Sequence, residues 1–131
     1  MAFEVKLVSP ERILYTGTAT QVLCRTVGGG DIAFLTGHAP LIGALDTWPV
    51  KITTVDQGEQ WFAVHGGFVE VSHDSVTLLS DIAEASDHID EERAQQARER
   101  AESELRDDAE DDEARAALAR AEVRLDVAGK S

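Results

Sequence analysis

Hydrophobic and polar residues follow two different periods along this chain. Up to about residue 86, apolar and polar side chains alternate in short runs such as residues 3–8 and 50–55, which is the period of half-buried β-strands. From residue 87 onward, apolar residues recur at spacings of three and four, which is the period of an amphipathic helix. The pattern therefore predicts a β-rich domain over residues 1–86 and a helical domain over residues 87–131.

Turn-forming residues divide the β-rich domain into short runs. Asp56, Gln57 and Gly58 predict a hairpin turn between two runs. Gly66 and Gly67 interrupt another run, which indicates a bulge or a close approach of two backbones. The spacing predicts eight to ten short strands, and therefore an all-β sandwich in the form of a flattened barrel.

The helical domain has the pattern of an antiparallel hairpin. Asp87 or Asp90 is a suitable N-cap for a first helix, a second helix begins near Asp112, and the acidic residues 107–113 form the connector. Because alanine buries little surface, the two helices pack closely but weakly. Such a hairpin suits a switch that opens at a cost on the order of a few kcal/mol, and an ordinary static hairpin fits the pattern equally well. The predicted apolar faces comprise Ala94, Ala97, Ala101 and Leu105 on the first helix and Ala114, Ala117, Leu118, Ala121, Leu125 and Ala128 on the second.

Charge and cysteine content exclude several classes of protein. The 131 residues carry a formal net charge of −13, which argues against binding to nucleic acid or to anionic lipid. The single cysteine, Cys24, excludes an internal disulfide, suits a reducing compartment and is expected to be a buried strand residue. No apolar segment reaches the roughly 18 residues of a membrane helix, and the N-terminus has no signal-peptide pattern. We therefore expect a cytoplasmic protein without direct membrane insertion.

Motifs of catalysis are missing from the sequence. The four histidines have neither HxH nor HExxH spacing, and one cysteine does not complete a zinc site. The chain has no GxSxG elbow and no phosphate-binding GxxxxGK[ST] loop, so Gly28, Gly29 and Gly30 are interpreted as a loop between two strands. We expect a protein that is not an enzyme and requires no cofactor or metal.

Residues 30–41, GDIAFLTGHAPL, join a short apolar strand to a tightly specified turn that contains His38. A turn of this kind without chemistry around it suggests a docking surface. Together with four other blocks in order along the chain, it resembles the epsilon subunit of bacterial F-type ATP synthase. The other blocks are residues 8–11, residues 63–71 (AVHGGFVEV), residues 76–84 and residues 89–94 (IDEERA).

The resemblance implies a sandwich of about ten strands followed by two antiparallel helices, in a rotor subunit of the central stalk. Such a subunit lies peripherally at the cytoplasmic face of the cell membrane and couples ATP synthesis to proton transport. The sandwich would bind the gamma subunit on one face and the polar loops of the c-ring at one end. By position in the motifs, Ser9 matches a gamma-facing turn, and Asp31 and His38 match loop residues that face the c-ring.

The hairpin resembles the inhibitory element of the family, which folds beside the sandwich or extends along gamma toward the alpha and beta subunits to block ATP hydrolysis. Extended, Arg115, Arg120 and Arg124 would pair with acidic segments of the beta subunit, and the acidic connector would weaken this contact or make it salt-dependent. Some members also bind regulatory ATP in the folded hairpin. The residues that match this ATP site are Glu84, Ile89, Asp90, Arg93, Arg100, Arg120 and Arg124.

Two questions stay open from the sequence. A free-standing nucleotide-sensing or adaptor module of the same build is the alternative function, and copurification with gamma and the c-ring would distinguish the two. The sequence also departs from the family pattern at Ala33, Thr36 and residues 46–49. Trp48, within residues 46–49, either contacts a partner protein or covers one end of the sandwich.

Overall fold

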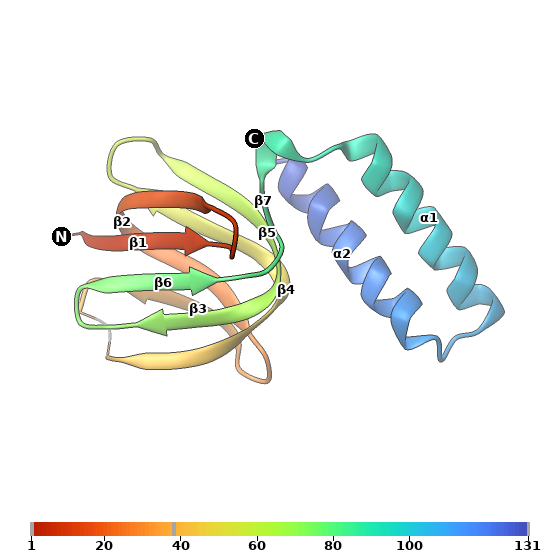
Figure 1. The fold of residues 1–131 in the computed structure, drawn as a ribbon, viewed down its shortest axis with the longest axis horizontal. Helices are drawn as coiled ribbons and strands as arrows, with labels where there is room; N and C mark the ends of the chain where they lie inside the picture. The colour runs from red at the N-terminus through yellow and green to blue at the C-terminus, as the bar shows by residue number, and fades with distance from the viewer. Residues whose placement is uncertain (1, 38, 131) are drawn as a thin grey trace.

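The computed structural model describes residues 2–37 and 39–130, which form a β-domain followed by a helical hairpin (Figure 1). Within these residues there are seven strands, one short 3-10 helix and two α-helices. The strands are β1 (Phe3–Val8), β2 (Ile13–Thr26), β3 (Gly30–Leu35), β4 (Leu41–Thr54), β5 (Glu59–Val71), β6 (Ser75–Leu79) and β7 (Ala83–Ala85), and the helices are η1 (Ser86–His88), α1 (Glu91–Asp107) and α2 (Asp112–Ala128).

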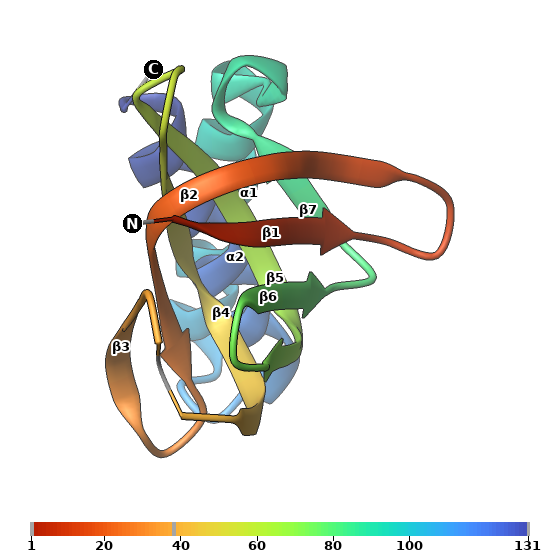
Figure 2. The ribbon, with the colours of Figure 1, turned by 90° about the vertical axis from the view of Figure 1, so that its left-hand side faces the viewer.

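The strands close on themselves into a flattened barrel. Their order is β1-β6-β5-β4-β2-β3, and β1 also pairs with β2, so the first and fifth strands of this order are joined. The pairing of β1 with β6 is parallel, whereas the other pairings are antiparallel. Figure 2 looks toward the N-terminal side of the β-domain and shows the strands curving around its interior. The predicted all-β sandwich of flattened-barrel form is confirmed.

Alternating burial explains why these runs become strands. In β1, Phe3, Val5 and Leu7 are buried, whereas Glu4 and Lys6 are exposed, as the period of two requires. Cys24 is fully buried in the same core. Burial raises the pKa of its thiol to about 12, so the thiolate that reacts with oxidants is scarce.

The expected number of eight to ten strands is too high, because three long strands continue through glycine or proline residues. β2 passes Gly17, β4 passes Pro49, and β5 passes Gly66 and Gly67. One register joins β4 and β5 from the Leu41↔Val71 pair to the Thr53↔Glu59 pair. Glycine and proline are unfavourable within strands, but pairing with the neighbouring strand keeps these residues in the sheet.

Gly66 and Gly67 lie where two backbones approach each other. Both have positive φ angles, +84° and +122°, and a Cβ atom on Gly67 would collide with the carbonyl oxygen of Leu79. The Ser80 hydroxyl donates to the carbonyl oxygens of Gly66 and Ile82 at 2.7 and 2.9 Å. The expected close approach is thus confirmed, and it lies between the segments where β5 pairs with β6 and with β7.

The two α-helices form the predicted antiparallel hairpin, and Figure 1 shows them side by side. Asp90, not Asp87, caps α1 by accepting a hydrogen bond from the backbone N–H of Arg93 at 3.1 Å. Asp111 caps α2 in the same way, so the connector is shorter than residues 107–113. Four alanines are buried along the seam, namely Ala94, Ala101, Ala114 and Ala121.

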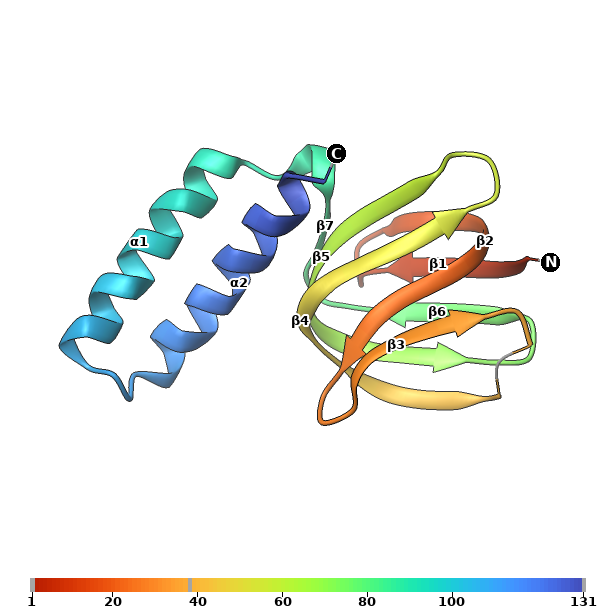
Figure 3. The same ribbon diagram turned by 180° about the vertical axis from the view of Figure 1, so that it is seen from behind.

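A second apolar face of α2 packs on the sandwich, and the alanine pattern did not predict it. Val123 and Val127 form a small core with Ala63 of β5, and Trp61 and Ile89 lie against this core. Figure 3 shows α2 next to β4 and β5, with α1 on the far side of α2. The hairpin is therefore attached to the sandwich mainly through α2. Among the described helices, none is both long and apolar enough to cross a membrane.

Replacing Gly67 by alanine should lower the free energy of unfolding by about 3 kcal/mol or more, because the new Cβ meets a backbone oxygen at an unfavourable φ. Urea unfolding followed by circular dichroism measures this loss. Gly28→Ala is the matched control, since Gly28 also has positive φ but no atom within 4 Å of a built Cβ, and it should cost only about 1 kcal/mol. Equal losses in the two variants would contradict the close approach at Gly67.

Candidate functional site at the hairpin junction

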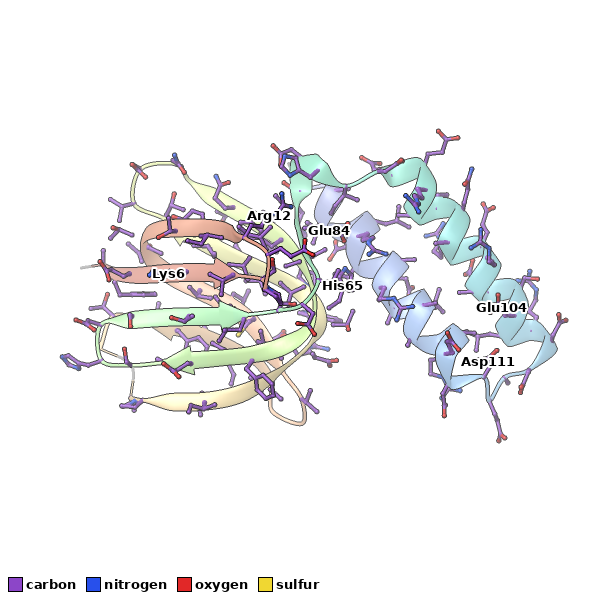
Figure 4. The ribbon with its side chains drawn as sticks, viewed as in Figure 1. Lys6, Arg12, His65, Glu84, Glu104 and Asp111 are labelled. Carbon is purple, nitrogen blue, oxygen red and sulfur yellow. The ribbon has the colours of Figure 1, made fainter. Side chains whose placement is uncertain are left out.

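Glu84 of β7 lies at the junction between the sandwich and the hairpin. Its register partner on β5 is Ala63, which packs against α2, so the Glu84 side chain is presented on the face that α2 covers. One carboxylate oxygen, Oε1, accepts hydrogen bonds from Arg124 Nε of α2 at 2.7 Å and from His65 Nε2 of β5 at 3.1 Å. Figure 4 shows His65 and Glu84 on the side of the sandwich that faces α2.

The surroundings keep the Glu84 carboxylate ionised. The hydrogen bond from His65 and the hydrogen bond and charge of Arg124 lower its pKa to about 2, against the opposing effect of burial. An ionised carboxylate only accepts hydrogen bonds, so the imidazole of His65 carries its proton on Nε2. The His65 side chain is 2% exposed, and its other nitrogen, Nδ1, is buried without a partner among the described residues.

A cavity of about 310 Å³ opens beside this cluster. Asp90 and Arg93 from the start of α1 line it opposite Glu84 and Arg124. Each helix thus contributes one guanidinium, and the two carboxylates balance these charges. The remaining lining residues are Ala94 and Ala97.

The structure brings together four of the seven residues expected for an ATP site, namely Glu84, Asp90, Arg93 and Arg124. Ile89 lies nearby but packs on the small core of Ala63, Val123 and Val127. Arg100 is exposed on α1 and does not line the cavity, and Arg120 lines a different groove.

Sequence reasoning missed His65 as a member of the cluster. A histidine inside a strand carries no motif, and its contact with Glu84 follows from the pairing of β5 with β7, which joins residues far apart in the chain. The available signal was the period of two, since Trp61, Ala63 and His65 share one face of β5. Only the position of α2 makes this face a buried one.

The three arginines expected to contact the beta subunit are divided between two places. Arg124 is held by Glu84, as described above. Arg115 and Arg120 line a groove of about 470 Å³ between α2 and Trp48 of β4. Arg115 donates to the carbonyl oxygen of Ala109 at 2.6 Å and lies 3.6 Å from an Asp112 oxygen.

Trp48 and Asp31 both contact Arg25. Asp31 lies in strand β3, and its Oδ1 accepts from Arg25 Nε at 2.9 Å. The Arg25 guanidinium also stacks 3.5 Å from the centre of the Trp48 ring. Asp31 is therefore a paired strand residue and not a loop residue, while His38 lies outside the described residues.

Ser9 lies in a different part of the sandwich, beside an apolar notch. The turn after β1 is closed by a hydrogen bond from Ser9 N to the carbonyl oxygen of Arg12 at 2.9 Å. The notch has a volume of about 270 Å³ and is also lined by Pro10, Phe68 and Leu79. Phe68 and Leu79 are paired across β5 and β6 and remain 59% and 45% exposed, which is typical of an interaction surface.

No cluster of His, Cys, Asp and Glu side chains suited to a metal ion occurs in the described ranges 2–37 and 39–130.

Residues 2–86 match the family described as "ATP synthase, Delta/Epsilon chain, beta-sandwich domain", and residues 87–129 match "ATP synthase, Delta/Epsilon chain, long alpha-helix domain". This chain belongs to the delta/epsilon chain family of ATP synthases.

Bacterial members of the delta/epsilon family are similar over most of the chain. The ATP synthase epsilon chain of Streptomyces griseus is 45% identical over 121 residues, which cover 92% of this chain and 90% of that protein. The epsilon chain of Brevibacillus brevis is 47% identical over 101 residues, or 77% of this chain and 76% of that protein. The epsilon chain is an accessory subunit, and this family member is accordingly not catalytic.

Solved structures share the fold of this delta/epsilon family member. A chain of the Euglena gracilis mitochondrial ATP synthase, in a structure of OSCP, F1 and c-ring, superposes with a TM-score of 0.71 at 19% identity. The alignment covers 95% of this chain and 76% of that chain. A chain of the Tetrahymena thermophila central stalk and c-ring superposes with a TM-score of 0.52 at 19% identity, over 65% of this chain and 67% of that chain.

Acid should weaken the junction through Glu84. Because its pKa is lowered from 4.5 to about 2, the stabilisation that this carboxylate contributes is present above about pH 4.5 and is lost as the pH falls toward 2. The stability difference between the unmodified chain and Glu84→Gln should thus be constant from about pH 7 to 5 and shrink below that range. Urea unfolding at each pH measures the difference. A gap that persists to about pH 2.5 would contradict the ion pair.

Proposed function

We propose that this chain is the epsilon subunit of the central stalk of a proton-translocating F-type ATP synthase. In this role it is a rotor subunit that couples the catalytic part to the c-ring. The match of both domains to the delta/epsilon family, in the right order over residues 2–86 and 87–129, carries the proposal. Peripheral attachment at the cytoplasmic face of the cell membrane follows from this assembly, because the partners supply the contact with the membrane.

The exposed apolar surface supports docking of the sandwich onto the gamma subunit. The notch beside Ser9 and the exposed pair of Phe68 and Leu79 provide an apolar surface of the kind that protein interfaces cover. We assign contact with the c-ring to the end of the sandwich that carries the turn after β3. Asp31 lies at the opposite end of β3, where it is 54% exposed and held by Arg25, so it is not included in this proposed c-ring contact.

The hairpin is proposed to inhibit ATP hydrolysis by leaving the sandwich and extending toward the alpha and beta subunits. Its attachment is small, because only Val123 and Val127 are buried with Ala63, with Ile89 packed against them, and alanines dominate the seam between the helices. Segments with so few buried apolar contacts open at lower cost than the rest of a fold. Once α2 is released, Arg124 loses Glu84 and joins Arg115 and Arg120 as a cation available to acidic segments of the beta subunit.

Regulatory ATP is proposed to bind in the cavity between the helices. Arg93 and Arg124 come from different helices, so one triphosphate held by both would join them and favour the folded hairpin. Glu84 opposes this binding in part, since its carboxylate already occupies Arg124. ATP therefore competes with Glu84 for the same guanidinium.

Deleting residues 87–131 should raise the ATPase activity of the assembled complex, because the inhibitory element is removed while the docking surfaces of the sandwich remain. ATPase and proton-pumping assays on complexes with and without these residues measure the effect. Copurification of the shortened chain with gamma and the c-ring is the control for assembly. Unchanged hydrolysis by an assembled complex would contradict the inhibitory role, and failure of the full chain to copurify would favour the free-standing module.

ATP should bind the isolated full-length chain with a dissociation constant below about 1 mM, and Arg93→Ala should weaken binding about tenfold by removing a charge-assisted hydrogen bond. Isothermal titration calorimetry measures both constants. Arg100→Ala is the matched control, because Arg100 is also on α1 but does not line the cavity. Equal weakening by the two substitutions, or a dissociation constant far above 1 mM, would contradict this site.

A further inference from the structure

His65 is an ionisable residue buried at a cost that the proposed function does not explain. Its side chain is 2% exposed, yet only Nε2 has a partner among the described residues, and Nδ1 is buried without one. A buried nitrogen that loses its hydrogen bond to water destabilises the fold unless another contact compensates. The compensating contact is the hydrogen bond from Nε2 to Glu84.

This hydrogen bond controls where the Glu84 carboxylate points. Glu84 is a flexible side chain that remains 30% exposed, so a solvent-facing rotamer is open to it. The backbone of His65 is fixed by strand β5, and its Nε2 donates to the same oxygen, Oε1, that accepts from Arg124. The acceptor for α2 is thus oriented from the sandwich before the helix arrives, which lowers the entropy lost on docking.

We propose that His65 is a positioning residue that holds Glu84 on Arg124 and thereby latches the hairpin to the sandwich when no ligand is bound. The latch consists of one residue from each of β5, β7 and α2. It acts together with the apolar contact of Val123 and Val127 on Ala63. The proposal rests on the opening of the hairpin described above, but it requires neither ATP binding nor inhibition of hydrolysis.

Hydrogen exchange of the native full-length chain, read by mass spectrometry, tests the latch. Amides of α2 report opening of the hairpin, and amides of β1 report unfolding of the sandwich. His65→Leu fills the site without a donor and should raise the opening equilibrium of α2 about fivefold to tenfold, with β1 unchanged. His65→Gln keeps an N–H of similar reach and should stay within about twofold of the unmodified chain.

A double-mutant cycle separates positioning from packing. If His65 acts on Arg124 through Glu84, its effect should depend on the presence of Arg124. In an Arg124→Ala background, His65→Leu should therefore raise the opening equilibrium of α2 by no more than about twofold. Arg100→Ala is the matched control on the exposed face of α1 and should leave opening unchanged. Fluorescence of Trp61 in a Trp48→Phe background provides a second readout, because Trp61 lies against Val123 and Val127, and Lys130 Nζ is 4.6 Å from the centre of its ring.

Three outcomes would overturn the latch. In the first, His65→Leu and Arg124→Ala raise the opening equilibrium of α2 independently, so that their effects multiply in the double variant. In the second, α2 opens as readily in His65→Gln as in His65→Leu. The third is exchange of α2 only together with β1 in every variant, which would remove hairpin opening itself. In contrast, a normal latch in a chain that neither binds ATP nor inhibits hydrolysis would reject those functions and leave the role of His65 standing.

Discussion

The continuous pairing of β4 with β5 is the constraint on which the other contacts depend. One face of this ladder forms the barrel core, including Val50, Ile52 and Val64, while the opposite face carries Ala63 and receives α2. β5 also pairs with β7, which places Glu84 beside the same face. Core, hairpin and junction therefore share one register, and a shift by one residue would exchange the two faces.

The hairpin is attached in a way that combines weak and specific contacts. Apolar burial between α2 and the sandwich is limited to a few side chains, so it supplies little energy compared with the barrel core. The hydrogen bonds of Glu84 depend strictly on geometry and define one docked position. A small apolar contact with one oriented ion pair suits an element that has to leave its site and return to the same place.

The sequence predicted much of the candidate site but not its organisation. Resemblance to the family indicated Glu84, Asp90, Arg93 and Arg124, which line one cavity. It also indicated Arg120, which lines another groove with Trp48, because Arg120 lies about one turn, or about 6 Å, closer to the start of α2 than Arg124. His65 was missed because its role arises from pairing between strands, and strand pairing has no local signal in the chain.

Local patterning by itself determined the two-domain build, the inward-facing residues of β1, the turn at Gly58 and the helices of the hairpin, because periods of two and of 3.6 reflect backbone geometry within one element. Tertiary structure alone decided that β2 and β5 continue through glycines and β4 through Pro49, that α2 has a second buried face, and that His65 and Arg124 meet at Glu84. These features depend on which elements become neighbours. The neighbours are set by the packing of elements that are distant in the sequence, so no single segment encodes them.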